Sequence, residues 1–275
     1  MKIRRVGIAL FSLILSSNLV NAQDSTFTNS IGMEFVRIAP GSYTLGKFEP
    51  TYPKPTDKKS SESYNDSQLK LAEQLAKKDA LPGFKVTINK SFYIGKFEVT
   101  QAQWKKVMGD NPSVFKGDKV TDDADQHPVE NVTWEQAQKF LVKLNQIEKG
   151  KKYRLPTEFE WEYAARAGAQ DDISWAEIRQ VAQMGNRSTS IVGQKKPNAW
   201  RLYDILGNVW EWVEDYYNEK LFADSIPIKK GKVHVLKGAS FTGDVKNATY
   251  MTHAAGPGNG WDVGFRVVMI AESEK

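Results

Sequence analysis

The stretch that decides how this chain folds is Asp204-Ile205-Leu206-Gly207-Asn208-Val209-Trp210-Glu211-Trp212. Its two carboxylates stand on either side of a Gly-Asn pair, which is typical of a tight turn, and two tryptophans alternate after the turn. Oxygen ligands, a turn and large apolar rings therefore lie close together in the sequence. This combination predicts either a binding site or a densely packed structural element.

Two other stretches are equally dense in charged and aromatic residues. The first reads Tyr153-Arg154-Leu155-Pro156-Thr157-Glu158-Phe159-Glu160-Trp161-Glu162, and the second combines Lys237-Gly238-Ala239-Ser240-Phe241 with Gly264-Phe265-Arg266-Val267. Thr157 and Glu160 have the spacing of a capping box at a helix start. We therefore expect the charged side chains of the first stretch to stabilise that helix rather than to act as acids or bases.

The composition is that of a globular protein with a sizeable core. The chain has 275 residues, of which 40% are hydrophobic, and its aromatic residues cluster in the second half. No internal repeat and no dividing linker is evident. We expect a single domain over residues 23–275, with a Pro-, Lys- and Ser-rich insertion at about 49–80.

The first 22 residues have the pattern of a secretory signal peptide. A basic start is followed by an apolar run and a small-residue cleavage site, which are Lys2, Arg4 and Arg5, then Val6 to Leu15, then Val20-Asn21-Ala22. An uncleaved membrane anchor is the weaker alternative, because the apolar run is too short to span a bilayer comfortably. The sequence predicts export to the periplasm and a mature chain beginning near Gln23.

Charge and cysteine content limit the possible partners and chemistry. Removing the signal's three basic residues from the total of 38 leaves a near balance against 33 acidic residues, and no basic stripe with interleaved aromatics is present. We therefore expect no nucleic-acid partner. No later apolar run resembles a membrane span, so no membrane partner is expected after signal cleavage. The chain has no cysteine, which removes disulfides and thiol chemistry.

Apolar periodicity and cap residues predict the secondary structure. Residues 31–45 alternate around Pro40-Gly41 and predict a β-hairpin, residues 84–99 alternate again, and residues 68–78 predict a short amphipathic helix in the insertion. Thr100, Thr133 and Thr157 each stand where a helix N-cap belongs, with the first helix ending at Gly109 and the third at Gly168. Residues 111–127 predict a surface loop, and irregular structure is expected after Gly168 until strand-like runs at 233–236 and 265–270.

Taken in order, the motifs resemble the formylglycine-generating-enzyme (sulfatase-modifying-factor) family from about Gly32 onward. Besides the stretches already quoted, the chain carries Gly32-Met33-Glu34-Phe35-Val36, Phe97-Glu98-Val99-Thr100, His127-Pro128-Val129 and Val132-Thr133-Trp134. The resemblance implies a single α+β domain of the C-type-lectin-like kind, with a small mixed sheet and much irregular structure. It does not fix the function, because one fold hosts several chemistries.

The family's known redox chemistry is not expected here. Formylglycine formation in the family uses a pair of cysteine thiolates that hold copper. Matching Gly-Ala-Ser-Phe at 238–241 to the family's Gly-Gly-Ser-Tyr places Gly243 and Ala248 at about those positions. We therefore expect no copper and no formylglycine-generating activity. The iron-dependent branch needs clustered histidines, whereas His127, His234 and His253 are far apart in this sequence, and only His253 lies near the former catalytic region.

A structural calcium ion is the metal that the resemblance implies. Hard cations bind oxygen, and the family loop supplies the Asp204 and Glu211 side chains with the Gly207 and Val209 carbonyls. Asp204 stands where many members have Asn, which keeps an oxygen and adds charge. The alternative is that Glu211 only pairs with a nearby Arg or Lys.

The candidate binding groove is what remains near the former catalytic region, formed by Ser240, Thr242, Asp244, His253 and Trp261. We expect a catalytically inactive periplasmic binding protein with a protein partner. One branch that it resembles consists of immunity proteins that neutralise toxic type VI secretion effectors. Two alternatives stay open: an oxidising enzyme resembling the pyoverdine-maturation proteins of siderophore synthesis, and an envelope scaffold protein.

Overall fold

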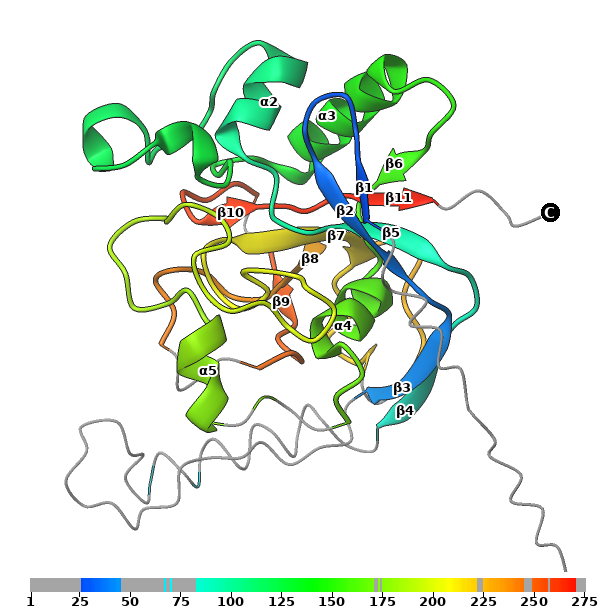
Figure 1. Ribbon diagram of the computed structural model, residues 1–275. Coiled ribbons are helices and arrows are strands. Elements are labelled where there is room, and N and C mark those ends of the chain that lie inside the picture. The colour runs from blue at the N-terminus through cyan, green and yellow to red at the C-terminus, as the bar shows by residue number, and fades with distance from the viewer. Residues whose placement is uncertain are drawn as a thin grey trace, which may run out of the picture.

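A computed structural model (Figure 1) describes residues 26–45, 83–170, 173, 175–221, 225–244, 249–256 and 258–270, together with Ser67 and Lys70. The expected signal peptide lies outside the described residues, and so does almost all of the expected insertion at 49–80 with its helix. No helix in the described part of the chain is long and apolar enough to cross a membrane.

The described chain forms three sheets and a few short helices. The strands are β1 (Thr26–Thr28), β2 (Glu34–Ile38), β3 (Gly41–Leu45), β4 (Phe84–Ile88), β5 (Phe92–Gly95), β6 (Tyr153–Arg154), β7 (Trp210–Tyr216), β8 (His234–Lys237), β9 (Ala254–Ala255), β10 (Val263–Gly264) and β11 (Val268–Ile270). The helices are α2 (Gln101–Met108), α3 (Trp134–Ile147), α4 (Glu158–Arg166) and α5 (Trp175–Val181), with 3-10 turns η1 (Gly117–Lys119) and η2 (Ala124–Gln126).

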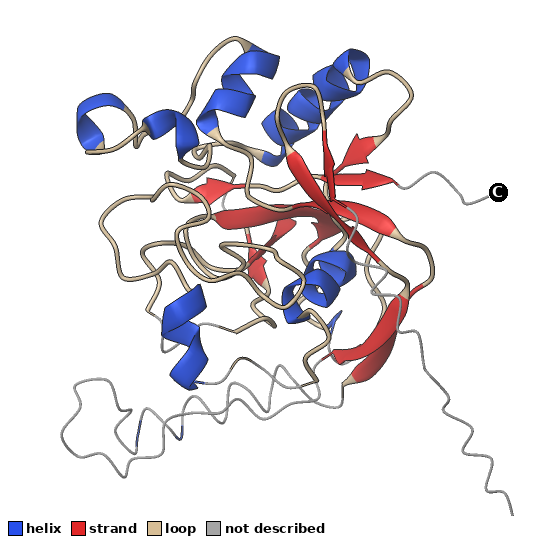
Figure 2. Cartoon of the chain, in the orientation of Figure 1, coloured by secondary structure: helices blue, strands red, loops and turns tan. Residues whose placement is uncertain are grey.

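The strand order is not the sequence order. The largest sheet has the order β1-β2-β5-β11-β6, the second has the order β10-β7-β8-β9, and β3 pairs with β4 alone. The late strand β11 thus lies between two earlier strands, with Val268 opposite both Ile94 and Arg154. This mixture of short strands, helices and long loops confirms the α+β class (Figure 2).

The helices cover both sides of the central strands. In Figure 1, α2 and α3 lie above β5, β7 and β11, whereas α4 and α5 lie below them. Each side has its own apolar core. On the α2–α3 side, Trp104 stacks on Phe140 at 5.4 Å, and on the α4 side Trp161 is fully buried. A tryptophan removes about 150–250 Å² from water, so these rings account for much of the packing energy.

The hairpin predicted for residues 31–45 is wrong, although both of its strands exist. β2 pairs with β1 and β5, whereas β3 turns away and pairs with β4. The corner between them is occupied by a side chain from α4. The Tyr163 hydroxyl donates to the Ala39 carbonyl at 3.3 Å, and a Cβ at Gly41 would lie 2.1 Å from that hydroxyl. Tertiary packing therefore separates two strands that the local pattern suggested would pair.

The three predicted helix starts are confirmed. Thr100, Thr133 and Thr157 each accept a hydrogen bond from the third helical residue, whose side chain bonds back to the cap. The first helix ends at Gly109, as predicted. α4 ends one residue before the predicted end at Gly168, because Ala167 already takes the left-handed conformation with φ 47°. The structure also contains α5, a helix in the region expected to be irregular.

Candidate functional site

The turn at 204–209 requires its glycine. Gly207 has φ +99°, and an added Cβ would lie 2.2 Å from the Gln183 carbonyl oxygen. The next residue, Asn208, donates its backbone N–H to the same oxygen at 2.8 Å, and Gly207 donates to the Gly238 carbonyl at 2.9 Å. The turn is thus clamped between two other segments, and only glycine fits without strain.

Glu211 is where the three quoted stretches meet. Its Oε2 accepts hydrogen bonds from the Trp161 Nε1 at 2.6 Å and the Arg266 Nε at 2.7 Å, and its Oε1 accepts from the Arg266 Nη2 at 2.6 Å. Glu211 and Arg266 are at most 1% exposed. Arg266 also donates to the carbonyls of Gly95 and Tyr203. The expected alternative, pairing with an arginine, therefore describes the Glu211 side chain in this structure.

Glu98 is a second buried carboxylate at the same turn. Its Oε2 accepts from the Asn208 Nδ2 at 2.7 Å, and its Oε1 accepts from the Val209 backbone N–H at 3.1 Å. We call Glu98, Asp204, Glu211 and Arg266 the acidic cluster. It contains three carboxyl groups and one guanidinium, all at most 2% exposed.

Burial raises the pKa values of two carboxyl groups in the acidic cluster, Glu98 and Asp204. Burial raises the pKa of Glu98 well above its usual range, and the neighbouring Asp204 and Glu211 carboxylates raise it further. Burial also raises the pKa of Asp204 to about 6, against the opposing effects of the Gly193 hydrogen bond and Arg266. Glu98 and Asp204 therefore hold protons more tightly than solvated carboxylates do, unless a cation replaces the protons.

The calcium expectation can be compared with this geometry. Asp204 Oδ2 accepts from the Gly193 N–H at 2.6 Å, whereas its buried Oδ1 has no hydrogen-bond partner. Asp204 also lines a small cavity of about 20 Å³, which has room for one water-sized particle. Within the described ranges, no three His, Asp or Glu side chains are grouped to hold a metal. An ion here would depend on Asp204 and backbone carbonyls, because Arg266 and Trp161 already engage Glu211.

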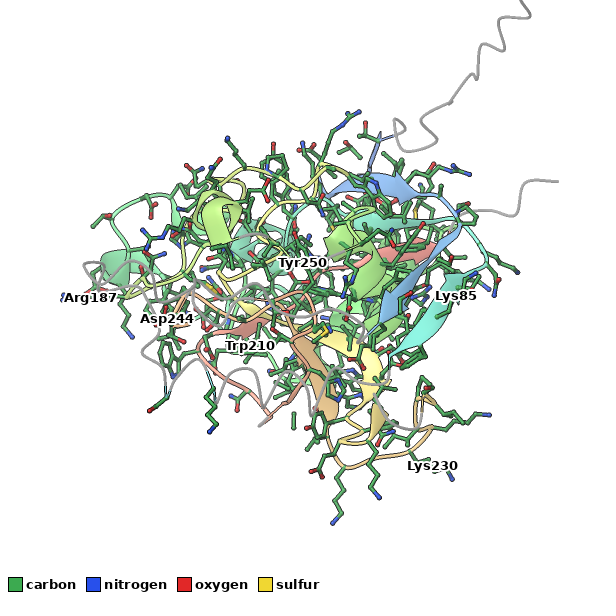
Figure 3. The ribbon with its side chains drawn as sticks, turned by 90° about the horizontal axis from the view of Figure 1, so that it is seen from below. Lys85, Arg187, Trp210, Lys230, Asp244 and Tyr250 are labelled. Carbon is green, nitrogen blue, oxygen red and sulfur yellow. The ribbon has the colours of Figure 1, made fainter. Side chains whose placement is uncertain are left out.

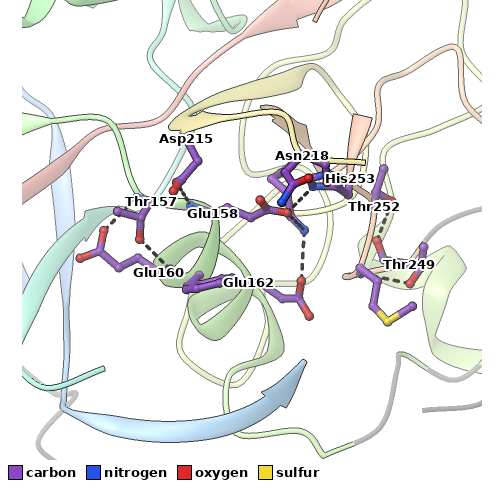
Figure 4. A network of polar contacts seen from close by, with 12 residues as sticks. Thr157, Glu158, Glu160, Glu162, Asp215, Asn218, Thr249, Thr252 and His253 are labelled. Carbon is purple, nitrogen blue, oxygen red and sulfur yellow. Dashed lines mark hydrogen bonds and ion pairs between the residues drawn. The ribbon is translucent and has the colours of Figure 1, made fainter. Parts of the chain in front are cut away.

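A second buried network includes side chains of α4, and Figure 4 shows its residues Glu158, Glu162 and His253. We call Glu158, Glu162, Arg166, Lys237 and His253 the balanced cluster. Lys237 is 0% exposed, and its Nζ lies 3.1 Å from Glu162 Oε2 and 3.7 Å from Glu158 Oε1. Arg166 donates to Glu162 Oε1 at 2.8 and 3.0 Å. Two carboxylates therefore face two fixed cations.

The start of α4 has the structural role expected for its charged residues. Arg154 forms two hydrogen bonds with Glu160, at 2.6 and 2.7 Å, and Glu160 Oε2 also accepts from the Thr157 N–H. Asp215 accepts from the Glu158 N–H at 2.6 Å (Figure 4). These contacts cap the helix and fix the two glutamates that it contributes to the balanced cluster.

Four of the five predicted groove residues gather around the 238–244 segment. Ser240 Oγ donates to Asp262 Oδ2 at 2.7 Å and lies 2.9 Å from the Thr242 hydroxyl. The neighbouring Trp261 is 48% exposed, and its ring lies 5.4 Å from that of Phe241. A polar hydroxyl pair therefore adjoins an exposed aromatic surface.

Thr242 and Asp244 line a surface cavity of about 450 Å³. The full lining is Arg179, Ala182, Met184, Gly185, Lys195, Thr242, Gly243 and Asp244. This volume lies within the range of small-molecule and peptide-side-chain pockets, and its lining carries both signs of charge. Gly243 is one of the two positions that the resemblance is expected to place near the family cysteines, and the other, Ala248, lies outside the described residues.

His253 belongs to the balanced cluster rather than to the groove. Its Nδ1 lies 2.5 Å from Glu158 Oε1, its Nε2 lies 3.1 Å from the Asn218 carbonyl oxygen, and its ring stacks on Tyr217. The other histidines occupy separate places. His127 bonds with Thr189 and Asp122, and His234 stacks on Trp134 at 3.8 Å.

Sequence reasoning missed three residues of the site. Glu98 lies in a quoted motif but was not singled out, because a glutamate in an alternating stretch usually faces solvent. Lys237 sits in the Lys-Gly-Ala-Ser-Phe stretch, and Asp262 follows Trp261. A lysine in an otherwise buried strand was the one available signal, because a buried lysine requires an acidic partner.

The model of the sulfatase-modifying factor enzyme 1-like domain matches residues 22–271. The chain belongs to this family.

Two relatives and one solved structure illustrate the range of similarity. The chaperone protein LppX of Paenibacillus barcinonensis is 30% identical, with 77% of this chain and 85% of LppX covered. The formylglycine-generating enzyme of Mus musculus is 29% identical, but the match covers 52% of this chain and 41% of that enzyme. PvdO from Pseudomonas aeruginosa has a TM-score of 0.69, covering 90% of this chain and 99% of PvdO, and its 22% identity shows the fold alone.

These findings support a non-catalytic or accessory member of the family. The chain has no cysteine, so it lacks the thiolates of formylglycine generation.

Proposed function

We propose that this protein is a non-catalytic family member that acts by binding another protein in the periplasm. The observation that carries the proposal is the exposed Trp261 beside the cavity lined by Thr242, Gly243 and Asp244. Tryptophan is one of the residue types that are enriched among binding hot spots, and a rigid support holds its ring in place for a partner. Trp261 has such a base, because its ring packs on those of Phe115 and Phe241.

Two partner classes fit this role, and we propose the first as the leading one. In the first, the protein is an immunity protein, and its partner is a toxic effector delivered by a type VI secretion system. In the second, the partner is a client whose folding the protein assists, which the similarity to the chaperone LppX favours. We rank the two alternatives from the sequence, an oxidation in siderophore maturation and an envelope scaffold, below these two classes.

The test is a periplasmic pull-down with the exported wild-type protein and the variant Trp261→Ala, with metal analysis of the same samples. Val142→Ala is the matched control, because Val142 is also an exposed large apolar residue, on α3. We expect one partner at stoichiometric level, retained by the control and weakened at least about tenfold by Trp261→Ala, as for a hot-spot residue. Stoichiometric copper or iron without a protein partner would contradict the proposal.

Activity assays on the recovered partner separate the two classes. An effector is active by itself and inhibited in the complex, whereas a client is inactive or aggregated unless it is made together with this protein. A partner that binds with the same affinity to wild type and Trp261→Ala would move the binding surface away from the cavity.

We also propose that Asp204 and the carbonyls of Gly207 and Val209 hold a structural calcium ion beside Glu211. The unpartnered Asp204 Oδ1 supports this proposal. Calcium that binds only the folded state raises the melting temperature in proportion to the logarithm of its concentration. We expect such a rise with calcium and a smaller one with magnesium, because oxygen-rich irregular sites favour the larger ion. The variant Asp204→Asn should weaken the effect, and no shift with wild-type protein would refute the site.

A further inference from the structure

The loop that joins β7 to β8 displays apolar side chains to solvent. We call its residues 225–233, Ser-Ile-Pro-Ile-Lys-Lys-Gly-Lys-Val, the tip. Ile226 is 68% exposed, and Ile228 and Val233 are each 37% exposed. Among the described residues, seven large apolar side chains are exposed, and three of them lie in this short segment. Scattered exposed apolar residues are ordinary, whereas a cluster of them marks an interaction site.

The same segment carries only positive charge. Lys229, Lys230 and Lys232 are exposed, and the tip contains no acidic residue. Within the described part of the chain, none of these three lysines forms an ion pair. The loop stands out from the body of the molecule, with Lys230 at its outer end (Figure 3). The tip therefore offers a surface that is both apolar and basic.

The tip is held on a defined base. Asn218 Nδ2 donates to the Ile226 carbonyl at 3.2 Å, and the Tyr217 N–H donates to the Val233 carbonyl at 3.0 Å. A Cβ at Gly231 would lie 2.8 Å from the Tyr216 Cβ, so the returning chain lies directly against β7. The isoleucines are therefore presented by an anchored loop and not by a loose chain end.

Helix α3 provides an internal comparison. It also has two exposed aliphatic residues, Val142 and Ile147, with Lys139 and Lys143 exposed nearby. Positions five apart on a helix point about 140° away from one another, so these side chains do not share one face. Both regions have similar composition, but only the tip gathers its apolar and basic groups at one projecting point.

We propose that the tip binds reversibly to an anionic phospholipid surface. Ile226 and Ile228 enter the boundary between headgroups and acyl chains, while the three lysines contact phosphate groups. Charge complementarity favours a lipid surface, because every charged side chain of the tip is a lysine. This mode needs no spanning helix, so it departs from the expectation of no membrane partner, which rested on the lack of apolar spans. It is independent of the protein-binding proposal.

The first test is flotation of the exported protein with vesicles of phosphatidylglycerol and phosphatidylethanolamine, compared with vesicles of phosphatidylcholine. In the tip variant, Gln replaces Lys229, Lys230 and Lys232. In the matched control, Gln replaces Lys139, Lys143 and Lys149. The wild type and both variants are prepared with the same N-terminus, so any contribution of residues 1–22 to vesicle binding is the same in all three. We expect the wild-type protein to bind anionic vesicles alone. The tip variant should bind them about fivefold more weakly per lysine replaced, or about a hundredfold in all, whereas the control variant should bind as the wild type does.

The second test uses the absence of cysteine from the chain. Ile226→Cys and the control Val142→Cys each provide a unique site for an environment-sensitive fluorophore. We expect the emission at position 226 to rise and shift to shorter wavelength with anionic vesicles, whereas position 142 stays unchanged. A thermal unfolding scan of each labelled protein confirms that it is folded.

Three results would overturn the proposal. These are no binding of the wild-type protein to anionic vesicles, equal losses in the tip and α3 variants, and an unchanged signal at position 226. If the tip variant instead loses a soluble protein partner while vesicle binding is absent, the tip is a protein interface and the lipid assignment is wrong. The Trp261→Ala pull-down is a separate experiment, so either proposal can fail without the other.

Discussion

The acidic cluster and the balanced cluster are both buried, yet they meet the cost of burying charge in different ways. In the balanced cluster, Glu158 and Glu162 face Lys237 and Arg166, so its two carboxylates are matched by two fixed cations. In the acidic cluster, Arg266 is the one guanidinium among three carboxyl groups. The remaining charge must be neutralised by protons or by a bound cation. The charge balance of the acidic cluster therefore depends on the pH or on a bound cation. In the balanced cluster, Lys237 and Arg166 already match the charges of Glu158 and Glu162.

The largest effect is expected from Arg266→Met. Removing one partner from a buried ion pair leaves an uncompensated charge and costs about 3–5 kcal/mol of unfolding free energy. We expect a loss toward the upper end of this range, because three carboxyl groups lose their guanidinium and two backbone carbonyls lose their donor. Denaturant unfolding measures the change.

Lys237→Met in the balanced cluster is the matched comparison. Its loss should be nearer to the lower end of the same range, because Arg166 still pairs with Glu162. If Lys237→Met is at least as destabilising as Arg266→Met, then protons already neutralise the acidic cluster and Arg266 contributes mainly through packing. Where Arg266→Met does not fold, Arg266→Lys, which keeps the charge but loses the bidentate pairing, gives the same ranking.

An intermediate effect is expected in the pH dependence of stability, measured with a chelator present. The pKa of Asp204 is about 6 in the folded protein, against 3.8 as the ordinary value, so the folded state binds the proton more tightly. The free energy of unfolding therefore falls as the pH rises from about 4 to 6, by about 3 kcal/mol for this group. Asp204→Asn should remove that fall.

The control for this prediction is Asp215, which adjoins the balanced cluster. Burial raises its pKa to about 6 as well, so the wild-type curve contains both contributions, and only the difference from Asp204→Asn is assigned to Asp204. Asp215→Asn should remove a separate part of the fall. A difference curve for Asp204→Asn that is flat between pH 4 and 6 would contradict the prediction, because it would mean that folding does not raise the pKa of Asp204.

The smallest effect is expected from Thr157→Ala at the start of α4. The Thr157 hydroxyl accepts from the Glu160 N–H at 3.2 Å, and losing an N-cap costs about 1 kcal/mol. Thr157→Ser keeps the oxygen and should restore most of the stability in thermal unfolding. A loss as large as that of Lys237→Met would show that the cap, and not the lysine, organises the balanced cluster.

The sequence predicted those features whose signals are local. Thr100, Thr133 and Thr157 carry their own caps, so the helix starts follow from a few adjacent residues. The partner strands of β2 and β3 could not be predicted from adjacent residues. The two strands do not pair with each other, because the hydroxyl of Tyr163, from a helix distant in the sequence, occupies the corner between them. A strand's partner is a property of the whole fold, and alternation alone identifies only the strand.

The site shows the same division. Asp204, Glu211 and Arg266 were all found in conspicuous motifs, and the structure brings these motifs together. Glu98 was missed because its partner Asn208 is 110 residues away, so nothing near Glu98 in the sequence shows that it is buried. His253 was assigned to the groove by its position in the sequence, but Glu158 and Asn218 hold it in the balanced cluster.

The position of β11 has a consequence for how the protein is made. Residues 268–270 form the strand between β5 and β6, so the two parts of the largest sheet cannot join until this segment has left the ribosome. Contacts between such distant segments close large loops and slow the search for the native state. Until then, β5 and β6 each lack the partner strand that joins them in the folded sheet. Deletion of residues 268–270 would leave the facing edges of β5 and β6 exposed and favour aggregation.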